Sequence, residues 1–376
     1  MTSTRVAIVG GGLSGLYAAY LLSSAGLTDY VVLEAKPLPG GRILSLDVGT
    51  PAAGMPSDDV GGDTFDLGPT WFWPEYQPRL SHLVESLGLQ RFAQYETGGM
   101  LVERAAGAPA RTHGFQNVPA SMRVRGGMGA LISALRRALE PSRLRLGCDV
   151  RQLVRNDAGV ALNVSDASGR ETAWHADYVL LATPPRMATS RIAFSPPLPE
   201  ALHRAWQGTD TWMAPHAKYV AVYDTAFWRD DELSGEARSQ RGPMVEIHDA
   251  SAPDGRGALF GFVGVPASAR ATLPETVLLA QCRAQLERLF GPKAAAPVVH
   301  AIQDWAQDPW VATPRDHNAY GAHNAAPTAT PAAGEWQGRL IGVASEWSPQ
   351  YPGYLAGAVE AAEIGVSALL QLAEFS

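Results

Sequence analysis

The stretch that decides the fold is Val6–Glu34, VAIVGGGLSGLYAAYLLSSAGLTDYVVLE. An apolar run over residues 6–9 leads into a Gly-x-Gly-x-x-Gly pattern at residues 10–15, after which apolar side chains recur at helical spacing. A second apolar run, over residues 30–33, ends in Glu34, nineteen residues past the last glycine of the pattern. This order of strand, glycine turn, helix and strand ending in an acid predicts a Rossmann-type dinucleotide-binding unit.

Glycines at such a turn let the backbone approach a pyrophosphate at the helix N-terminus, and the acid can accept a hydrogen bond from a ribose hydroxyl. The glycine pattern alone can be a plain turn, but here both strands, the helix and the acid accompany it. The unit by itself leaves NAD and FAD equally open. The residues expected to hold the nucleotide are Gly10, Gly12, Leu13, Ser14, Gly15, Glu34 and Ala35.

Composition narrows the class of protein. At 376 residues the chain suits two domains that share a large core. A net charge of -7 and the lack of a basic run argue against a nucleic-acid partner. With only Cys148 and Cys282 present, we expect no disulfide framework and a reducing compartment. No metal site is expected.

We expect a cytoplasmic protein without a membrane anchor. The first strand starts within a few residues of Met1, so no signal peptide is expected before it. No apolar stretch is expected to span a bilayer, because Glu360 and Glu363 interrupt the C-terminal helix. The oligomeric state stays open, since no coiled-coil seam or exposed apolar stripe stands out.

A second glycine pair follows the opening unit. Residues 39–42, PGGR, place backbone N–H groups and one fixed positive charge where a second phosphate contact would be useful. The glycine fingerprint, the acid and this GGR resemble the FAD-binding start of the flavin amine oxidase family. The resemblance implies FAD in place of NAD, with Gly41 and Arg42 among the residues that bind it.

Residues 66–71, DLGPTW, resemble the family's D-x-G segment beside the flavin ring; the alternative is a turn that carries an aromatic side chain. Residues 47–62 are rich in Gly, Pro and Asp and predict a loop longer than the family usually has here. The excursion that follows, at 73–125, is shorter than the family's, which implies a reduced cap over the active site. The resemblance implies FAD contacts from Gly68, Pro69, Thr70 and Trp71.

The next block begins with a family-like GGM entry at residues 126–128, and residues 144–153 predict one strand. The family carries on this strand a valine whose backbone meets the adenine. Val150 matches that position, although a plain core valine would look identical. Residues 177–185, DYVLLATPP, predict a buried strand ending at a turn and again resemble the family.

Lys218 opens a strand-like run, KYVAVY, with Phe-Trp just beyond it at residues 227–228. The family has a lysine, a tyrosine and Phe-Trp at the same offsets, and its lysine contacts flavin N5 through a water. The resemblance implies the same role for Lys218; the alternative is a strand-edge lysine with its ammonium in solvent. Lysine occurs elsewhere only at Lys36 and Lys293, which favours a specific role for one inside an apolar strand.

The last segment predicts a buried strand over residues 340–346 and then a loop that enters a long helix. It resembles the family's closing motif, an acid followed by G-Y-x-x-G-A-V-x-A. A helix N-terminus aimed at the flavin pyrimidine would stabilise the negative charge of the reduced ring. A generic packing helix would explain the alanines but not the Gly-Tyr entry. The resemblance implies FAD contacts from Glu346, Gly353, Tyr354 and Leu355.

Tyr354 falls on one of the two aromatic positions that flank the substrate nitrogen in monoamine oxidases. The other position falls near Arg315 and is not preserved; an arginine there could instead meet a substrate carboxylate. No cysteine lies near the family's covalent attachment position, which implies non-covalent FAD. The candidates for substrate contact are Trp71, Trp310, Arg315 and Tyr354.

The resemblance implies an α/β fold with two domains. A discontinuous FAD-binding domain of the Rossmann type (GR2-like) takes residues 1–72, 125–206 and 335–376, and an inserted α+β substrate domain takes residues 73–124 and 207–334. The implied catalytic residues are Lys218 and Tyr354.

The reaction that the resemblance implies is hydride transfer from the α-carbon of a neutral amine to flavin N5. The imine then hydrolyses, and O2 reoxidises the flavin to give hydrogen peroxide. Two alternatives stay open: a flavin desaturase or other FAD oxidoreductase acting on a non-amine substrate, and a non-catalytic FAD-binding partner subunit.

Overall fold

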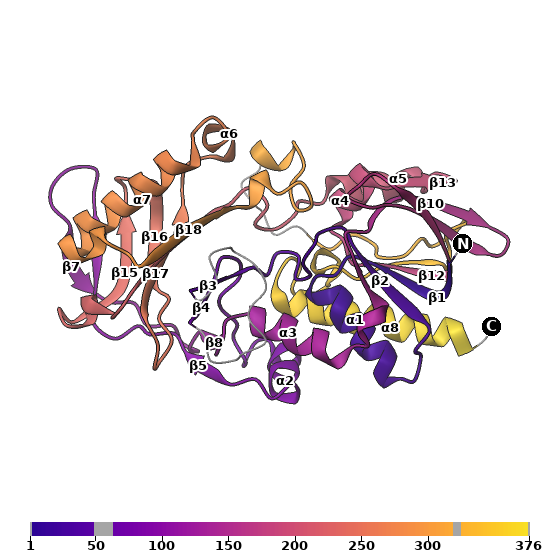
Figure 1. Cartoon of the computed structure of the whole chain (residues 1–376), viewed down its shortest axis with the longest axis horizontal. Coiled ribbons are helices and arrows are strands. Elements are labelled where there is room, and N and C mark those ends of the chain that lie inside the picture. The colour runs from indigo at the N-terminus through magenta and orange to yellow at the C-terminus, as the bar shows by residue number, and fades with distance from the viewer. Residues whose placement is uncertain (1, 49–62, 319–324, 375–376) are drawn as a thin grey trace. The chain divides into compact units, whose positions relative to one another are not determined.

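This computed structural model describes residues 2–48, 63–318 and 325–374. The chain divides into two compact units (Figure 1). Unit 1 is built from Met1–Arg42, Ile132–Ala214 and Pro309–Ser376, and unit 2 from Ile43–Leu131 and Pro215–Asp308. The long loop expected at residues 47–62 lies mostly outside the described residues.

Unit 1 contains a mixed sheet with the strand order β13-β10-β11-β12-β1-β2-β9, and β19 pairs with β12. Its strands are β1 (Thr2–Val9), β2 (Tyr30–Glu34), β9 (Leu144–Leu146), β10 (Asp149–Asn156), β11 (Gly159–Ser165), β12 (Glu171–Leu181), β13 (Ala193–Ser195) and β19 (Leu340–Gly342). Its helices are α1 (Leu13–Ser24), α4 (Pro185–Arg191), α5 (Glu200–Gly208) and α8 (Leu355–Glu374), and α3 (Gly129–Ala138) crosses the boundary between the units.

The parallel part of this sheet explains the continuous apolar runs in the sequence. β1 pairs in parallel with both β12 and β2, and β2 pairs in parallel with β9. Strands covered on both faces are apolar at nearly every position, as residues 6–9 and 30–33 are. The strand expected at 177–185 is the second half of β12, which pairs with β1 and β19.

One predicted strand in this unit is wrong. Residues 144–153 do not form a single strand, because the chain turns at Gly147, where φ is 67°. β9 ends before the turn and pairs with β2, whereas β10 begins after it and pairs with β11. The apolar pattern continues across the turn, so only the glycine marks the break.

The sequence predicted no apolar stretch that could span a bilayer, but the C-terminal helix α8 meets the length and composition criteria. Within the described residues, Leu355–Leu372 is the one helical stretch that is long and apolar enough, by length and composition, to cross a membrane. Buried helices of soluble proteins have the same composition, and 56% of this stretch is buried inside the protein. α8 lies beside α1 (Figure 1), and Tyr17 Oη donates a 3.0 Å hydrogen bond to Glu363.

Unit 2 contains a second sheet with the order β18-β14-β17-β16-β15-β6-β7, and two small pairs, β3-β4 and β5-β8. Its strands are β3 (Ser45–Asp47), β4 (Thr64–Asp66), β5 (Arg91–Ala93), β6 (Gly99–Glu103), β7 (Ala110–His113), β8 (Met122–Val124), β14 (Ala217–Tyr223), β15 (Leu233–Ser239), β16 (Met244–Asp249), β17 (Gly257–Val263) and β18 (Val299–Asp304). Its helices are α2 (Pro78–Ser86), α6 (Ala267–Arg270) and α7 (Glu275–Phe290).

The two faces of this sheet pack against different partners. Tyr219 and Tyr223 of β14 pack with the apolar side of α7, which lies across the sheet in Figure 1. Val220 and Val222 point to the opposite face and pack with β3 and β4. Side chains alternate along a strand, so Lys218 belongs to this second face, away from α7.

The observed units have different boundaries from the expected domains. Residues 43–72 were expected in the FAD-binding domain, but they belong to unit 2 because Leu46 and Phe65 pack on Val220 and Phe260. Residues 125–131 also belong to unit 2, and 207–214 and 309–334 belong to unit 1. Which ligand each unit binds stays a prediction.

Candidate functional site

The glycine turn of unit 1 has the geometry of a phosphate-binding helix entry. Gly10 adopts φ 110°, a conformation that residues with a side chain rarely adopt. Gly12 is the N-cap of α1 and no side chain caps this end of the helix. The first N–H groups of α1, from Leu13, Ser14 and Gly15, therefore face the position of an anion without an intrahelical partner.

Two close approaches require glycine at this turn. A Cβ at Gly10 would lie 2.9 Å from the carbonyl oxygen of Ala182, which follows β12. A Cβ at Gly15 would collide with the carbonyl oxygen of Gly10 itself. The first turn of α1 is therefore packed directly onto the end of β1, as close helix-strand packing at a dinucleotide site demands.

Glu34, the acid at the end of β2, is buried next to the glycine turn. Its Oε2 accepts a hydrogen bond from Gly11 N at 2.5 Å, and its Oε1 accepts from Lys36 N at 2.8 Å. A carboxylate oxygen can accept more than one hydrogen bond, and the ribose hydroxyl stays the predicted partner of this side chain. Ala35 follows directly as a half-buried residue.

The structure brings the second glycine pair to the first. Gly40 N donates to Gly11 O at 2.9 Å, and Gly12 and Gly40 form an isolated parallel bridge. Gly41 adopts φ 62°, and a Cβ there would lie 3.3 Å from the Cα of Gly12. Two glycine-rich segments predicted separately from the sequence thus form one backbone cradle.

Arg42 and Glu346, both predicted to bind FAD, form a bidentate pair. The guanidinium donates to Oε1 of Glu346 at 2.6 Å and to Oε2 at 3.0 Å. It also donates to Ser345 Oγ and to the carbonyl of Trp212. Glu346 lies in the 3-10 helix Ser345–Trp347, not on the preceding strand as expected, which ends at Gly342. The pair therefore ties the GGR segment to the C-terminal motif.

The Gly-Tyr entry of α8 packs against Trp212. Gly353 adopts φ 85°, and a Cβ there would lie 2.5 Å from the Cβ of Trp212. Tyr354 is 38% exposed, and its ring centroid lies 6.2 Å from that of Trp212 with the planes tilted by 32°. Leu355 is the first residue of α8. Glycine is thus required here because of both its backbone angle and its neighbour.

Val150 is a buried residue of β10 in the core of unit 1. It lies opposite Val164 of β11, and the pairing shifts between Val150 and Gln152. This bulge is a break in the ladder where backbone groups can turn to a ligand. Its contact with adenine stays a prediction.

Lys218 is buried in unit 2, with only 2% of its surface exposed. Its Nζ donates to the carbonyl of Gly68 at 2.9 Å and to Thr70 Oγ1 at 2.5 Å. Nζ also lies 4.0 Å from the centroid of the Phe260 ring. The alternative of a strand-edge lysine with its ammonium in solvent is therefore wrong. Lys218 and the D-x-G segment were predicted as separate flavin contacts, and hydrogen bonds connect them in the structure.

Burial dominates the electrostatics of this lysine. It lowers the pKa of Lys218 to about 7, although the charge of Asp66 acts in the opposite direction. Burial also raises the pKa of Asp66, against the charges of Lys218 and Arg123. Asp66 accepts a 2.7 Å hydrogen bond from the backbone N–H of Met128, in the GGM entry. A group with a pKa near 7 can gain or lose a proton at neutral pH.

Trp71 packs against Phe260, the aromatic side chain next to the Lys218 ammonium. Its Nε1 donates to Gln94 Oε1 at 2.7 Å. Its ring lies 4.8 Å from that of His248 and 5.3 Å from that of Phe260, centroid to centroid. Pro69 joins Gly68 to Thr70, so the whole DLGPTW segment wraps around the buried lysine and its aromatic neighbours.

The two remaining substrate candidates lie in other surroundings. The Trp310 ring stacks on the guanidinium of Arg191, which lies 3.8 Å from the ring centroid. Arg315 is exposed, while its neighbour Asp316 is buried and paired with Arg186 at 2.6 Å. Trp310 and Asp316 thus have arginine partners, and the substrate roles of Trp310 and Arg315 stay predictions.

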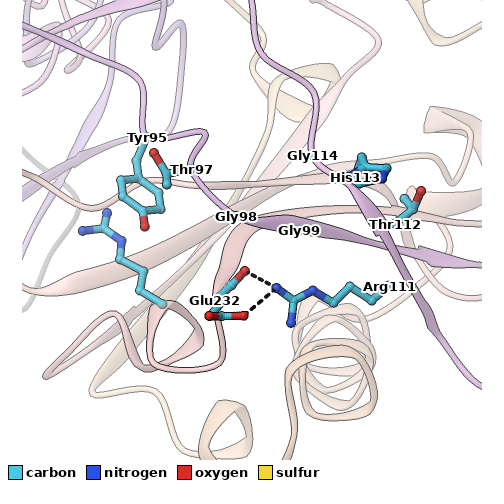
Figure 2. Close-up of a pocket in the computed structure, with 10 residues that line it drawn as sticks. Tyr95, Thr97, Gly98, Gly99, Arg111, Thr112, His113, Gly114 and Glu232 are labelled. Carbon is cyan, nitrogen blue, oxygen red and sulfur yellow. Dashed lines mark hydrogen bonds and ion pairs between the residues drawn. The ribbon is translucent and has the colours of Figure 1, made fainter.

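A further cavity of about 850 Å³ opens in unit 2 (Figure 2). Figure 2 shows Arg111 and Glu232 pointing toward each other, joined by a 3.3 Å ion pair. Arg229 also lines the cavity; it stacks on Tyr95 at 3.8 Å and is held by Asp249. Within the part of the chain that the structure describes, no residue predicted from the sequence for cofactor or substrate lines this cavity.

Comparisons with known proteins show which family the chain belongs to. The family model for flavin containing amine oxidoreductase matches residues 94–370, and the model for an NAD(P)-binding Rossmann-like domain matches residues 8–87. The chain belongs to the flavin containing amine oxidoreductase family.

Relatives and solved structures are consistent with this family. A probable flavin-containing monoamine oxidase A of Dictyostelium discoideum is 24% identical over 94% of this chain and 95% of its own length. The fold matches that of wild-type putrescine oxidase bound to putrescine, with a TM-score of 0.76, 23% identity and coverage of 98% and 99% of the two chains. It also matches cyclohexylamine oxidase from Brevibacterium oxydans IH-35A, with a TM-score of 0.77, 18% identity and 99% coverage of both chains.

The residues of this amine oxidoreductase fit the FAD that its family implies. The glycine turn packs too closely for a Cβ at Gly10 or Gly15, an uncapped helix N-terminus begins at Gly12, and Glu34 lies beside it. Arg42 adds one guanidinium at the end of the second glycine pair. Neither cysteine belongs to these segments, since Cys148 follows β9 and Cys282 lies in α7.

Three residues that contact the predicted site residues were not predicted from the sequence. Trp212 lies beside Gly353 and Tyr354, Phe260 lies under Lys218, and Gln94 holds Trp71. Trp212 and Gln94 lie in connecting segments, and Phe260 lies in β17. No local sequence pattern indicated any of the three, since each contact depends on the tertiary fold.

Proposed function

We propose that the protein is an FAD-dependent oxidase of amines. The observation that carries the proposal is Lys218, a lysine buried on a sheet face among Thr70, Trp71 and Phe260. A buried lysine of this kind, in a family of flavin amine oxidoreductases, supports an active-site role over a structural one. By resemblance, its Nζ would meet flavin N5 through a water.

The chemistry that bound FAD supplies is acceptance of a hydride from the α-carbon of a neutral amine, followed by reoxidation by O2 to hydrogen peroxide. The amine nitrogen loses its proton to solvent and the imine is hydrolysed to a carbonyl compound and ammonia. The chain's own residues bind, orient and dehydrate the reacting groups.

Several of the predicted residues have a defined task in this proposal. The glycine cradle and Arg42 hold the pyrophosphate, and Glu34 holds a ribose hydroxyl. Lys218, with its pKa lowered to about 7 by burial, holds or releases a proton at Nζ near neutral pH. Tyr354 presents an aromatic face to the substrate nitrogen. We propose that FAD is bound non-covalently.

An amine panel scored for two products tests this function. Monoamines, diamines, polyamines and amino acids are incubated with the purified protein in air, and peroxide and ammonia are measured together. We expect equal amounts of both with at least one primary amine. Peroxide without ammonia from non-amine substrates would support a desaturase or alcohol oxidase instead. Neither product with any compound would favour a non-catalytic FAD-binding subunit.

A further inference from the structure

The cavity of about 850 Å³ in unit 2 has no part in the proposed function (Figure 2). Its volume lies within the range of small-molecule sites in proteins, about 300–1,000 Å³. Three segments line it: the loop between β5 and β6, the paired ends of β6 and β7, and the turn that leads into β15. In Figure 2, Tyr95 and Thr97 lie on one side, Arg111 and His113 on the other, and Glu232 between them.

Backbone contacts hold the three segments together around this cavity. Glu232 adopts φ 54°, a left-handed conformation that costs a residue with a side chain about 1 kcal/mol or more. Its carbonyl oxygen accepts from Gly99 N at 2.9 Å and from Arg111 Nη2 at 2.9 Å. A Cβ at Gly98 would lie 2.4 Å from the same oxygen, so glycine is required there. The backbone of the lining is therefore preformed, as it usually is at ligand sites.

Arg111 is held in place mainly by neutral backbone groups. Its guanidinium donates to the carbonyls of Asp231 and Glu232 at 3.2 and 2.9 Å. Within the described part of the chain, its one ion pair is with the Glu232 carboxylate, 3.3 Å away. That side chain is 85% exposed, and exposed ion pairs contribute only about 0–1 kcal/mol. An anionic ligand can therefore replace the Glu232 carboxylate while the carbonyls keep Arg111 in position.

Arg229 is fixed along one edge of its guanidinium and has a donor left at the other. Nε and Nη2 donate to Oδ2 of the buried Asp249 at 3.0 and 2.8 Å. The guanidinium also stacks on the ring of Tyr95, 3.8 Å from its centroid. Among residues 2–48, 63–318 and 325–374, Nη1 has no hydrogen-bond partner. A guanidinium carries five N–H donors, so Nη1 remains available to an acceptor in the cavity.

The charges around the cavity favour an anion with two negative groups. Within the described residues, Glu232 is the only acidic residue of the lining, since Asp249 lies outside it. Two guanidinium groups, one from β7 and one from the turn before β15, thus face a single exposed carboxylate. When the Glu232 side chain moves into solvent, both positive charges are open to a ligand. Guanidinium groups bind carboxylates through charge-assisted hydrogen bonds.

We propose that this cavity binds a small organic dicarboxylate, with one carboxylate on Arg111 and the other on Arg229. In the free protein, the Glu232 carboxylate occupies the position of the first ligand carboxylate. The inference goes beyond the proposed function and does not depend on it, because no residue of the lining is assigned to FAD or to the amine.

Matched ligands test this assignment by calorimetry. The holoprotein is titrated with the series from malonate to adipate, and with pentanoate, which has the carbon chain of glutarate but a single carboxylate. We expect at least one dicarboxylate to bind more tightly than pentanoate by about tenfold or more, the contribution of a second charged hydrogen-bonded group. Inorganic phosphate, a compact anion that cannot reach both arginines, should also bind more weakly.

Substitutions in the lining distinguish a binding role from a structural one. Arg111→Gln, at an exposed position of β7, should weaken dicarboxylate binding by about tenfold or more. Arg229→Lys keeps a positive charge beside the buried Asp249 but loses the planar fork, and it should also weaken binding. Glu232→Gln removes the competing carboxylate and should strengthen binding, by up to about fivefold. Arg125→Gln, at another partly exposed arginine of unit 2, is the control.

Three results would overturn the inference. The first is that no dicarboxylate binds to the wild-type holoprotein. The second is that pentanoate or phosphate binds as tightly as every dicarboxylate, which would indicate a general attraction of anions. The third is dicarboxylate binding that Arg111→Gln, Arg229→Lys and Glu232→Gln leave unchanged, or that Arg125→Gln weakens equally, in variants whose circular dichroism matches the wild type.

Discussion

Lys218 is the predicted catalytic residue of unit 2, and its position on β14 buries its ammonium. The same sequence pattern could have placed the ammonium in solvent, but the side chain is buried and bonded to Gly68 and Thr70. The sequence indicated this residue because lysine is rare in the chain and the run around it is apolar. It could not indicate Phe260 beneath the ammonium, which depends on the register between β14 and β17.

Replacing this lysine tests its role at the residue scale. We expect Lys218→Met to keep the fold and its FAD, because methionine fills a similar apolar volume. The rate of flavin reduction or of reoxidation should fall by about tenfold or more, since the polar group beside the reacting atoms is lost. Stopped-flow absorbance measures both steps. The exposed Lys293→Met is the matched control, and equal rates in both variants would reject a role for Lys218 beside N5.

The pKa of Lys218 predicts a pH dependence of stability. An ordinary lysine has a pKa of 10.5, whereas that of Lys218 is about 7, so between these values the unfolded chain holds a proton that the folded protein lacks. Raising the pH across this interval removes that proton from the unfolded chain and increases the free energy of unfolding. The wild type should therefore gain stability relative to Lys218→Met between about pH 7 and about pH 10, measured by urea unfolding of the holoprotein. A constant difference between the two proteins would contradict a lowered pKa.

At the element scale, the opening strand-turn-helix-strand unit was predictable in full. Apolar residues are continuous before the glycines and recur at helical spacing after them, and the acid ends the second strand. The break between β9 and β10 was not predictable from the apolar pattern, because residues on both sides of Gly147 are those of a strand. It follows from tertiary bonds, since Gly147 N donates to Lys36 O and Cys148 N to Glu34 O.

Glu34 gives this element a direct test. Glu34→Ala removes the acceptor of both Gly11 N–H and Lys36 N–H, together with the expected ribose contact. We expect weaker FAD retention by about tenfold or more and a loss of stability of about 1–3 kcal/mol from the backbone donors left unpaired. Dialysis followed by flavin absorbance measures occupancy. Glu200→Ala, at an exposed position of α5, serves as control, and full flavin occupancy in Glu34→Ala would contradict the ribose assignment.

At the scale of the whole molecule, the fold class and the family were predictable, and the side-chain neighbours were not. Motifs with fixed spacing, such as the glycine turn and the Gly-Tyr entry, identify an element wherever it lies in the chain. Residues 43–72 carried a cofactor motif, yet their side chains pack with unit 2. The Arg42–Glu346 pair likewise joins segments 304 residues apart, which no local pattern could reveal.

We propose that this fold oxidises amines with bound FAD, and anaerobic reduction of the flavin is the most direct test. The purified holoprotein is mixed without oxygen with mono-, di- and polyamines and amino acids while the absorbance of oxidised flavin is followed. We predict that at least one amine bleaches this absorbance and that admitting air restores it with release of hydrogen peroxide. Unchanged absorbance with every amine in the panel would contradict amine oxidation by this protein.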